Sequence, residues 1–372
     1  MFEHIPKLGF GLMRLPMNGG EIDIAQTAEM VDLFLDSGFT YFDTAYVYFE
    51  GKSEMAAKEV LFDRHPREKF QFATKLPAWA QSNKTADDAK QMFWTSLKRT
   101  GAEYFDFYVM HNLSASRTKA FDDFGMWDYF LELKEKGLIR HMGFSFHDKA
   151  NVLDELLSKH PETEFVMLQL NYADWESGIV QSRLCHEVAR KHNVPIIAME
   201  PVRGGMLGGN LPMEVQSVLR EADPASSCAS WAIRFAASLD GVFTVLSGMS
   251  NIDQLRDNIG YMKDFKPLSD KEYSVIDKAR ETLAALPSIP CTSCDYCIPV
   301  CPKGLVIPQI FDMVNRDLLY KDFNSAKFGY TWGASFNGKG SDCIACGKCE
   351  EVCPQQIEIS SELQKAAEKF ED

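Results

Sequence analysis

The sequence lacks any run of about 18 consecutive apolar residues, the length that a membrane-spanning helix requires. Its first residues, MFEHIPKLGF, also lack the basic segment followed by an apolar segment that marks a secretory signal. Clusters of lysine or arginine are absent and the formal net charge is −14, so the general field repels nucleic-acid backbones. We therefore expect a cytoplasmic protein that binds neither a membrane nor nucleic acid.

Cysteine is scarce before residue 290, where only Cys185 and Cys228 occur. Both stand alone in segments of helical pattern, where a free cysteine usually packs as a small apolar residue. The other eight of the ten cysteines lie in two tight groups near the C-terminus. The disulfides of a small secreted protein would be spread along the chain, so this grouping indicates metal binding instead.

The 372 residues suit a barrel of roughly 250–300 residues with a smaller appendage. From residue 7 to about 260, short runs rich in Val, Ile, Phe and Tyr alternate with longer segments of helical period, as in βα units around a parallel sheet. The eight candidate strands are 7–11, 41–45, 70–75, 105–110, 141–146, 166–171, 195–200 and 242–247. This number favours a closed (β/α)8 TIM barrel, an α/β fold, although it does not exclude an open sheet. No GxGxxG follows the first strand, which removes the main sign of a dinucleotide-binding open sheet.

Helix signals lie between these strands and after them. The segments 86–100 and 127–136 each end before a glycine that suits a left-handed C-cap, and 269–284 reads as a polar helix. We place a domain boundary near residue 287, which gives a barrel over 1–287 and a small α+β ferredoxin-like domain over 288–372. Within the second domain we predict an amphipathic segment at 308–320 and a Gly/Asn-rich loop at 329–341.

Four ionisable residues, Asp43, Tyr48, Lys75 and His111, stand at or just after the ends of predicted strands, which share one mouth in a parallel barrel. A tyrosine hydroxyl can give a proton to the oxygen of a carbonyl that receives a hydride. Its reference pKa is near 10, so a lysine beside it would help by stabilising the phenolate, and an aspartate would keep that lysine charged. Taken alone, each residue has an ordinary structural explanation: a lone histidine is usually a satisfied core residue, and Asp43 could cap its loop.

Eight motifs occur in order over residues 5–262: GFGLMRLP, FDTAYVYFEGKSE, FATKL, FDFYVMHN, GFSFH, LQLNY, MEPVRGG and LSGMSNIDQLRDN. In these motifs the chain resembles the aldo-keto reductase superfamily, whose members are (β/α)8 barrels that reduce carbonyl compounds with NAD(P)H. Asp43, Tyr48, Lys75 and His111 fall on the four catalytic residues of that family. The resemblance implies that Tyr48 is the acid, that Lys75 and Asp43 tune it, and that His111 orients the substrate.

The same resemblance implies which residues contact the cofactor. Ser145 and Gln169 would hold the nicotinamide amide, and Tyr172 would stack on the ring. Residues 200–209 (EPVRGGMLGG) resemble the loop that crosses the pyrophosphate, where glycine lets backbone N–H groups approach phosphate. The full predicted set is Ser145, Gln169, Tyr172, Pro201, Gly204, Gly205, Gly248, Gln254, Asp257 and Asn258.

The choice between NADH and NADPH depends on the residues near the adenosine ribose. Asp257 and Asn258 resemble the pair that reads the adenine. Relatives that prefer NADPH often place lysine or arginine against the 2′-phosphate, whereas Gly248 and Gln254 stand at those positions here. This favours NADH and leaves NADPH open. Asn251 and Gln254 also make an ordinary helix-start capping box.

The C-terminal cysteines form two runs of the pattern C-x2-C-x2-C-x3-C-P, the pattern of bacterial ferredoxins that carry two [4Fe-4S] clusters. Because the fourth cysteine of each run ligates the other cluster in those proteins, the resemblance implies two ligand sets. These are Cys291, Cys294, Cys297 with Cys353, and Cys343, Cys346, Cys349 with Cys301. A pair of structural zinc sites is the alternative, but zinc does not call for three successive CxxC spacings and a Cys-Pro.

Two classes of function stay open. The chain is a carbonyl reductase whose clusters serve assembly or exchange electrons with a ferredoxin or flavoprotein, or it is an iron–sulfur electron-transfer protein whose barrel is a scaffold or partner-binding module. Cubanes pass single electrons and NAD(P)H passes a hydride, so a flavin would normally join them, but no flavin signature is evident. The aromatic residues Phe121, Phe124, Trp127 and Trp175 suggest an apolar or aromatic carbonyl substrate. An acidic surface is compatible with a homodimer.

Overall fold

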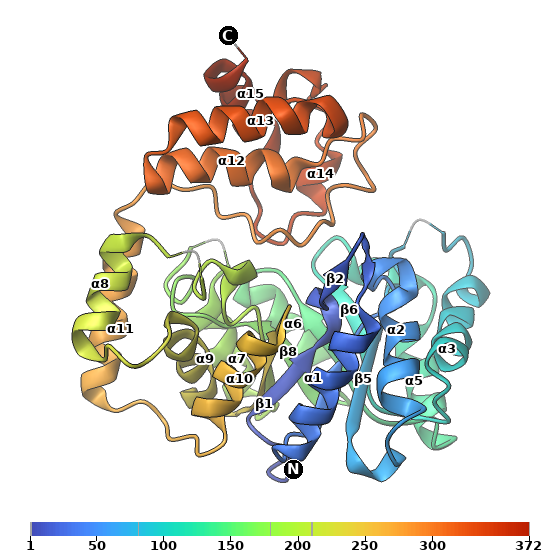
Figure 1. The fold of residues 1–372 in the computed structure, drawn as a ribbon. Coiled ribbons are helices and arrows are strands. Elements are labelled where there is room, and N and C mark those ends of the chain that lie inside the picture. Colours follow the sequence, from blue (N-terminus) through green and yellow to red (C-terminus); the bar gives the residue numbers. More distant parts are fainter. Residues whose placement is uncertain (1, 81, 179, 210, 372) are drawn as a thin grey trace. The chain divides into compact units, whose positions relative to one another are not determined.

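The computed structural model describes residues 2–80, 82–178, 180–209 and 211–371 (Figure 1). Its contacts divide the chain into two compact units. The first comprises residues 1–176, 181–201 and 229–269, and the second comprises 177–180, 202–228 and 270–372. The domain boundary near residue 287 stays a prediction.

The described part of the first unit contains a closed barrel of eight parallel strands, which confirms the predicted fold class. Around the barrel the strands follow one another in the order β1, β10, β9, β8, β7, β6, β5, β4, and β4 pairs with β1 to close it. The strands are β1 (Leu8–Gly11), β4 (Tyr41–Asp43), β5 (Gln71–Leu76), β6 (Phe105–Leu113), β7 (Ile139–Phe146), β8 (Phe165–Gln169), β9 (Ile196–Met199) and β10 (Val242–Gly248). A hairpin of β2 (Met17–Asn18) and β3 (Glu21–Ile22) follows the first strand.

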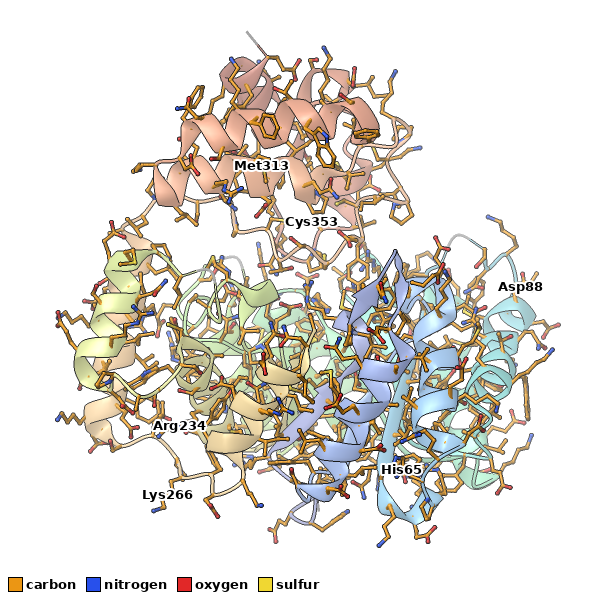
Figure 2. The ribbon with its side chains drawn as sticks, viewed as in Figure 1. His65, Asp88, Arg234, Lys266, Met313 and Cys353 are labelled. Atoms are coloured by element: carbon orange, nitrogen blue, oxygen red, sulfur yellow. The ribbon has the colours of Figure 1, made fainter. Side chains whose placement is uncertain are left out.

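Helices lie outside the strands, as the alternating sequence pattern predicts (Figure 1). They are α1 (Ile24–Asp36), α2 (Lys52–Ala57), α3 (Ala86–Thr100), α4 (Thr118–Asp123), α5 (Met126–Glu135), α6 (Ala150–Lys159), α7 (Ser182–Lys191), α9 (Cys228–Ser238) and α10 (Ile252–Met262). Helix α3 shows how capping residues in the sequence set the start and the end of a helix. Thr85 and Asp88 form a reciprocal capping box at its start, where Figure 2 labels Asp88, and Gly101 ends it at φ 70°.

The remaining helices belong to the second unit. They are α8 (Met213–Ala222), α11 (Asp270–Ala284), α12 (Ile307–Tyr320), α13 (Phe323–Asn337), α14 (Lys348–Glu351) and α15 (Ile359–Phe370). Buried apolar residues of α12, α13 and α15, such as Phe311, Ala326 and Leu363, form a core with the buried Cys297 and Cys349. No strand is assigned among described residues after 288, so the small domain is helical where the sequence predicted a mixed α+β domain. None of the described helices is both long and apolar enough to cross a membrane.

The predicted loop at 329–341 is wrong, because α13 continues to Asn337. Ala326 and Tyr330, four residues apart, are buried on one face of this helix. Tyr330 also donates its hydroxyl hydrogen to Glu371 at 2.6 Å, which ties α13 to the end of α15. Tertiary packing of this face outweighs the cost of two interior glycines, about 1 kcal/mol each.

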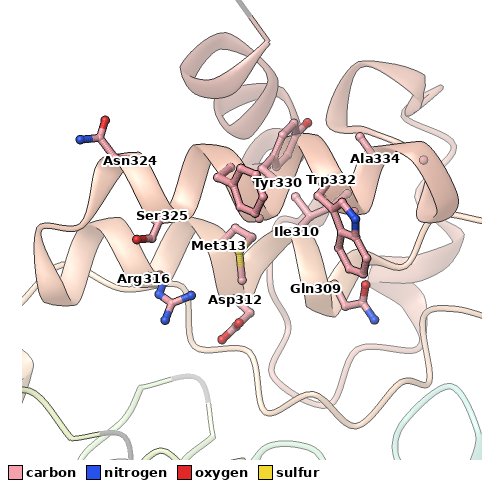
Figure 3. Close-up of a pocket in the computed structure, with 14 residues that line it drawn as sticks. Gln309, Ile310, Asp312, Met313, Arg316, Asn324, Ser325, Tyr330, Trp332 and Ala334 are labelled. Carbon is pink, nitrogen blue, oxygen red and sulfur yellow. The ribbon is translucent and has the colours of Figure 1, made fainter. Parts of the chain in front are cut away.

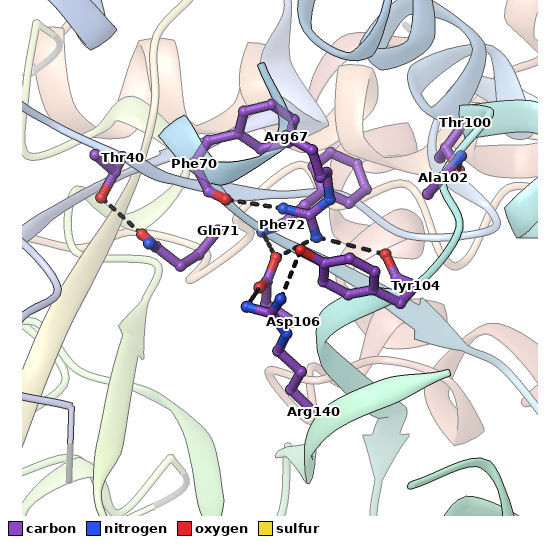
Figure 4. Close-up of polar contacts among 10 residues, drawn as sticks. All are labelled: Thr40, Arg67, Phe70, Gln71, Phe72, Thr100, Ala102, Tyr104, Asp106 and Arg140. Carbon is purple, nitrogen blue, oxygen red and sulfur yellow. Dashed lines mark hydrogen bonds and ion pairs between the residues drawn. The ribbon is translucent and has the colours of Figure 1, made fainter. Parts of the chain in front are cut away.

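The N-terminal ends of the strands carry a charged cluster around Asp106 (Figure 4). The Asp106 side chain is 4% exposed and accepts hydrogen bonds from Arg67, from Arg140 at 3.1 Å and from the Phe72 N–H at 2.9 Å. The Arg67 guanidinium carbon lies 4.2 Å from the centre of the Tyr104 ring. This end of a TIM barrel contributes stability rather than catalysis.

Replacing Asp106 by asparagine is expected to destabilise the barrel by about 3 kcal/mol or more, because it leaves arginines without their buried counter-charge. Circular dichroism should show a melting temperature lower by roughly 6–10 °C. Asp123→Asn is the matched control, since Asp123 pairs with Lys119 on the surface and should change stability by less than about 0.5 kcal/mol. Equal melting temperatures for the two variants would contradict a structural role for Asp106.

Stability should also fall on acidification below about pH 4.5 because of Glu164. Burial raises the pKa of Glu164, but hydrogen bonds from His141, from Lys134 at 2.6 Å and from the Met142 N–H outweigh it and lower the pKa to about 2. The depressed folded-state pKa contributes up to about 3 kcal/mol above pH 4.5, and this contribution is lost as the pH falls from 4.5 to 2. Urea unfolding at pH 6 and pH 3 should therefore show that Glu164→Gln lowers the unfolding free energy at pH 6 much more than at pH 3. An equal loss at both pH values would contradict the linkage.

Candidate active site

Asp43 and Lys75 form a buried ion pair at the ends of two neighbouring strands. Asp43 is the last residue of β4, and Lys75 lies in β5, which pairs with β4 in parallel. Their side chains are 4% and 2% exposed. Lys75 Nζ donates to Asp43 Oδ1 and, at 2.7 Å, to the carbonyl oxygen of Thr44. These bonds fix the position of the lysine ammonium.

Tyr48 is held against this ion pair by a strained turn. Lys75 Nζ donates to Tyr48 Oη at 3.4 Å. The chain then runs through three left-handed residues, Phe49 (φ 49°), Glu50 (φ 56°) and Gly51 (φ 92°), of which the first two carry a side chain. Such conformations cost about 1–3 kcal/mol for residues other than glycine and cluster at functional sites. The turn follows directly on Tyr48, whose hydroxyl lies beside the ammonium of Lys75.

His111 is a residue of β6 and lies across from Tyr48. Its ring centre is 5.9 Å from that of Tyr48, with the two planes nearly perpendicular at 83°. Burial, followed by the charges of Lys75 and Arg117 and by the neighbouring His147, holds the pKa of His111 well below its usual range. The imidazole is therefore neutral at physiological pH and can donate a hydrogen bond without carrying charge. The structure thus brings all four predicted catalytic residues together.

The charge balance at Lys75 involves a carboxylate that the sequence analysis did not single out. Burial lowers the pKa of Lys75, while Asp43 and then Glu54 oppose this effect. Glu54 is fully buried, accepts from Thr74 at 2.7 Å and pairs with Arg99 at 3.0 Å. The signal was present, because Glu54 ends the motif FDTAYVYFEGKSE, but its long-range partner Arg99 could not be read from the sequence.

Three further residues surround His111 and were also missed. Trp79 Nε1 donates to the carbonyl oxygen of His111 at 2.5 Å, and the Arg117 guanidinium carbon lies 4.4 Å from the Trp79 ring. Burial, together with Arg117 and Lys75, lowers the pKa of His147 to about 3. Each residue follows the end of a predicted strand, which is the signal that could have identified it.

The predicted nicotinamide contacts lie at the ends of two adjacent strands, β7 and β8. Ser145 Oγ accepts from the Asn112 N–H at 2.7 Å, and Gln169 Nε2 donates to Asp174 at 2.8 Å. The Asp174 carboxylate is buried and also accepts from Asn171 at 2.9 Å, so it fixes the orientation of the Gln169 amide. Tyr172, fully buried, meets the ring of Phe235 edge-on at 6.3 Å.

The predicted phosphate loop is divided between the two units. Pro201 belongs to the first unit, whereas Gly204 and Gly205 belong to the second. Both glycines have positive φ, 66° and 97°, and a Cβ at Gly204 would lie 2.4 Å from the carbonyl oxygen of Thr292. Glycine is thus needed at position 204 for close packing within the second unit, whatever this loop binds.

The predicted adenosine contacts lie at the end of β10 and on α10. The Gln254 side chain is exposed and accepts from the Ser250 N–H at 2.8 Å, while Asn251 caps the helix by accepting from the Gln254 N–H. Asn258 is buried, donates to Ser247 at 2.7 Å and accepts from Tyr261 at 2.5 Å. Its amide therefore makes internal bonds. Gly248 ends β10, and Asp257 is half-buried.

Two of the aromatic residues suggested for the substrate pocket are part of the core instead. Phe121 is fully buried, and Trp127 is 7% exposed. The Trp127 ring stacks on His160 with centres 3.5 Å apart, and its Nε1 donates to Asp122 at 3.0 Å. The side chains of Phe121 and Trp127 pack in the core, so they carry no information about the polarity of the substrate.

The eight clustered cysteines surround two cavities in the second unit. One is lined by Cys291, Cys294, Cys297 and Cys353, and Figure 2 labels the last of these. The other is lined by Cys301, Cys343, Cys346 and Cys349. The fourth cysteine of each run thus lies with the first three of the other run, as the ferredoxin resemblance implies. Among the described residues, no three His, Cys, Asp or Glu side chains are placed to bind a single metal ion.

A model of the aldo/keto reductase family matches residues 7–281, about three quarters of the chain. The chain belongs to the aldo/keto reductase family. In this aldo/keto reductase, a model of 4Fe-4S dicluster domains matches residues 290–358. Both matches confirm the resemblances predicted from the motifs.

Two relatives of this aldo/keto reductase share about a quarter of their residues with it. An aldo-keto reductase of Mycobacterium sp. (strain MCS) is 26% identical over 273 residues, 73% of this chain and 86% of the relative. The 9,11-endoperoxide prostaglandin H2 reductase of Trypanosoma cruzi is 25% identical over 280 residues, 74% of this chain and 88% of the relative. Each alignment thus covers about three quarters of this chain.

Solved structures share the barrel fold. The holo form of a Bacillus halodurans aldo-keto reductase gives a TM-score of 0.59 at 24% identity, covering 74% of this chain and 92% of that one. A Klebsiella pneumoniae aldo/keto reductase in complex with NADP and acetate gives 0.58 at 18% identity, covering 74% and 91%. At these identities the likeness shows the fold alone.

Proposed function

We propose that this aldo/keto reductase reduces an aldehyde or ketone to an alcohol with NADH or NADPH, and that Tyr48 supplies the proton. The observation that carries the proposal is the position of Lys75 Nζ, which donates both to Asp43 and, at 3.4 Å, to Tyr48 Oη. An ammonium in this position stabilises the phenolate that forms when Tyr48 gives up its proton. Asp43 keeps the ammonium charged in a buried site.

His111 has a separate role in the proposal. As a neutral imidazole it donates a hydrogen bond to the carbonyl oxygen and aligns it with Tyr48, whose ring centre is 5.9 Å away. When bound, the nicotinamide cofactor supplies the hydride. The chain offers Ser145 and Gln169 at adjacent strand ends for the carboxamide of that cofactor, with Asp174 orienting the Gln169 side chain. Hydrogen-bonding groups in this arrangement fit an amide ligand.

The residues proposed to contact the adenosine end of the cofactor favour NADH over NADPH. Gln254 is neutral and exposed at the start of α10, and Gly248 has no side chain, so neither offers a charge for a 2′-phosphate. The Klebsiella structures that share the fold contain NADP or NADPH. Initial rates of carbonyl reduction, measured once with NADH and once with NADPH, decide between the two cofactors.

We further propose that the two cysteine sets bind two [4Fe-4S] clusters that exchange electrons with a ferredoxin or flavoprotein. Four thiols around each cavity fit the four irons of a cubane. When bound, each cluster transfers one electron at a time. The protein supplies the ligands and a largely buried setting, since Cys297 and Cys349 belong to the hydrophobic core of the small domain.

The test is to mix anaerobically reconstituted protein with NADH, with and without a panel of aldehydes and ketones, while nicotinamide and cluster absorbance are recorded together. Consumption of NADH that requires a carbonyl supports the reductase. Bleaching of the clusters by NADH alone would show that the barrel and the clusters share electrons. Absence of NADH turnover with every carbonyl would contradict the proposal and favour an electron-transfer protein with a scaffold barrel.

A further inference from the structure

Helix α13 presents a stripe of exposed aromatic residues. Phe328, Trp332 and Phe336 are 74%, 65% and 73% exposed, more than any other aromatic side chain of those described as exposed. Their four-residue spacing places them on one face of the helix, and the ring centres of Trp332 and Phe336 are 5.4 Å apart. A contiguous exposed apolar patch of this kind marks an interaction site more often than a solvent-facing surface.

A groove between α12 and α13 borders this stripe. Its volume is about 710 Å³, and Met313, Arg316, Phe328, Tyr330 and Trp332 are among the residues that line it (Figure 3). Aromatic residues, methionine and arginine are the types enriched in protein–protein interfaces, and tryptophan, tyrosine and arginine are the commonest sites of large binding energy. The lining therefore matches a surface that a protein partner covers.

The groove lies close to the second cysteine set. Gly338 lines its end, and a Cβ at Gly338 would lie 2.4 Å from Leu305 Cδ2. Leu305 in turn lines the cavity of Cys301, Cys343, Cys346 and Cys349. Within that set Cys346 is exposed, and its neighbour Ile344 is 57% exposed. Leu305 thus lies beside both Gly338 of the groove and this cavity, and the exposed Cys346 and Ile344 place part of the cavity lining at the surface.

The size of the stripe indicates a transient partner rather than a second copy of this chain. Aromatic side chains present about 150–250 Å² each when fully exposed, so these three, at 65–74% exposure, present roughly 310–530 Å². With an equal area on the partner, the interface would bury roughly 600–1100 Å². Weak electron-transfer complexes lie near this size, whereas obligate dimers bury about 2000 Å² or more.

We propose that the aromatic face of α13, with the α12–α13 groove and Ile344, is the docking surface for a soluble one-electron carrier protein. This inference rests on the proposed function, because it needs a [4Fe-4S] cluster held by Cys301, Cys343, Cys346 and Cys349. The reduced carrier loses one electron and the cluster gains it, so no covalent bond forms or breaks and no proton moves. The exposed Cys346 edge of this cysteine set is the entry and exit point for electrons.

The experiment compares two reductants in anaerobic stopped flow on the reconstituted full chain. Pre-reduced bacterial dicluster ferredoxin and pre-reduced flavodoxin serve as protein carriers, and reduced methyl viologen is the small-molecule control. The test variant is Trp332→Ala with Phe336→Ala. The matched control is Trp94→Ala, since Trp94 is an exposed tryptophan of α3 in the barrel. Iron and acid-labile sulfide are measured for every protein.

The double variant should accept electrons from at least one protein carrier at least tenfold more slowly than the wild type, with an unchanged methyl viologen rate. Trp94→Ala should react like the wild type with both. Equal rates for wild type and double variant with both carriers overturn the proposal. A wild-type dimer in sedimentation that the double variant abolishes would also overturn it, because a second copy would then cover the face. A wild type without iron, or one that methyl viologen cannot reduce, points instead to failure of the proposed cluster binding.

Discussion

Tyr48→Phe is expected to lower kcat for carbonyl reduction by about 10²–10⁴-fold, the range of a general acid, while the KM for the nicotinamide cofactor changes little. The substitution removes the hydroxyl to which Lys75 Nζ donates and leaves the ring beside His111 in place. Steady-state rates with a fixed aldehyde measure the loss. Cofactor binding, followed by nicotinamide fluorescence, shows that the site is otherwise intact.

Tyr46→Phe is the matched control, because it makes the same chemical change two residues away. The Tyr46 ring lies under the Arg99 guanidinium at 4.2 Å, away from the proposed proton path. This variant should retain most of the wild-type kcat. If Tyr48→Phe kept more than a tenth of the activity, or if Tyr46→Phe lost as much, the assignment of the acid would be wrong.

Cysteine variants are expected to show which thiols share a cluster. Cys353→Ala should damage the same cluster as Cys291→Ala, although the two residues lie 62 positions apart, because both line the same cavity. The double variant should then lose no more iron than either single variant, roughly four of about eight irons per chain. Cys353→Ala combined with Cys301→Ala should damage both clusters, because Cys301 lines the other cavity.

Iron and sulfide analysis, with electron paramagnetic resonance of the reduced protein, measures these losses. Cys185→Ala is the control, since Cys185 is a buried cysteine of α7 in the barrel. It should leave the iron content unchanged. The opposite pattern, in which Cys291 and Cys301 act on one cluster and Cys353 acts on the other, would show that each run binds its own cluster. Zinc in place of iron would exclude both arrangements.

Local signals account for much of the agreement between sequence and structure. The eight strand segments are buried on both faces and so read as apolar runs, and Gly101 and Gly137 stop their helices with positive φ. The prediction of a loop at 329–341 failed because it too relied on local signals. Gly329, Gly333 and Gly338 suggested a loop, but the buried faces of Ala326 and Tyr330 decided the outcome.

The sequence by itself determined the barrel, the cysteine spacing and the four residues of the candidate active site, because strand ends in a parallel barrel must share one mouth. Only the tertiary structure showed that Glu54 and Arg99 support Lys75, that Trp79, Arg117 and His147 surround His111, and that Asn258 bonds internally. It also joined α12 and α13 into a groove beside the second cysteine set. These contacts link residues far apart in the chain, and no local periodicity or spacing encodes which distant side chain fills a given space.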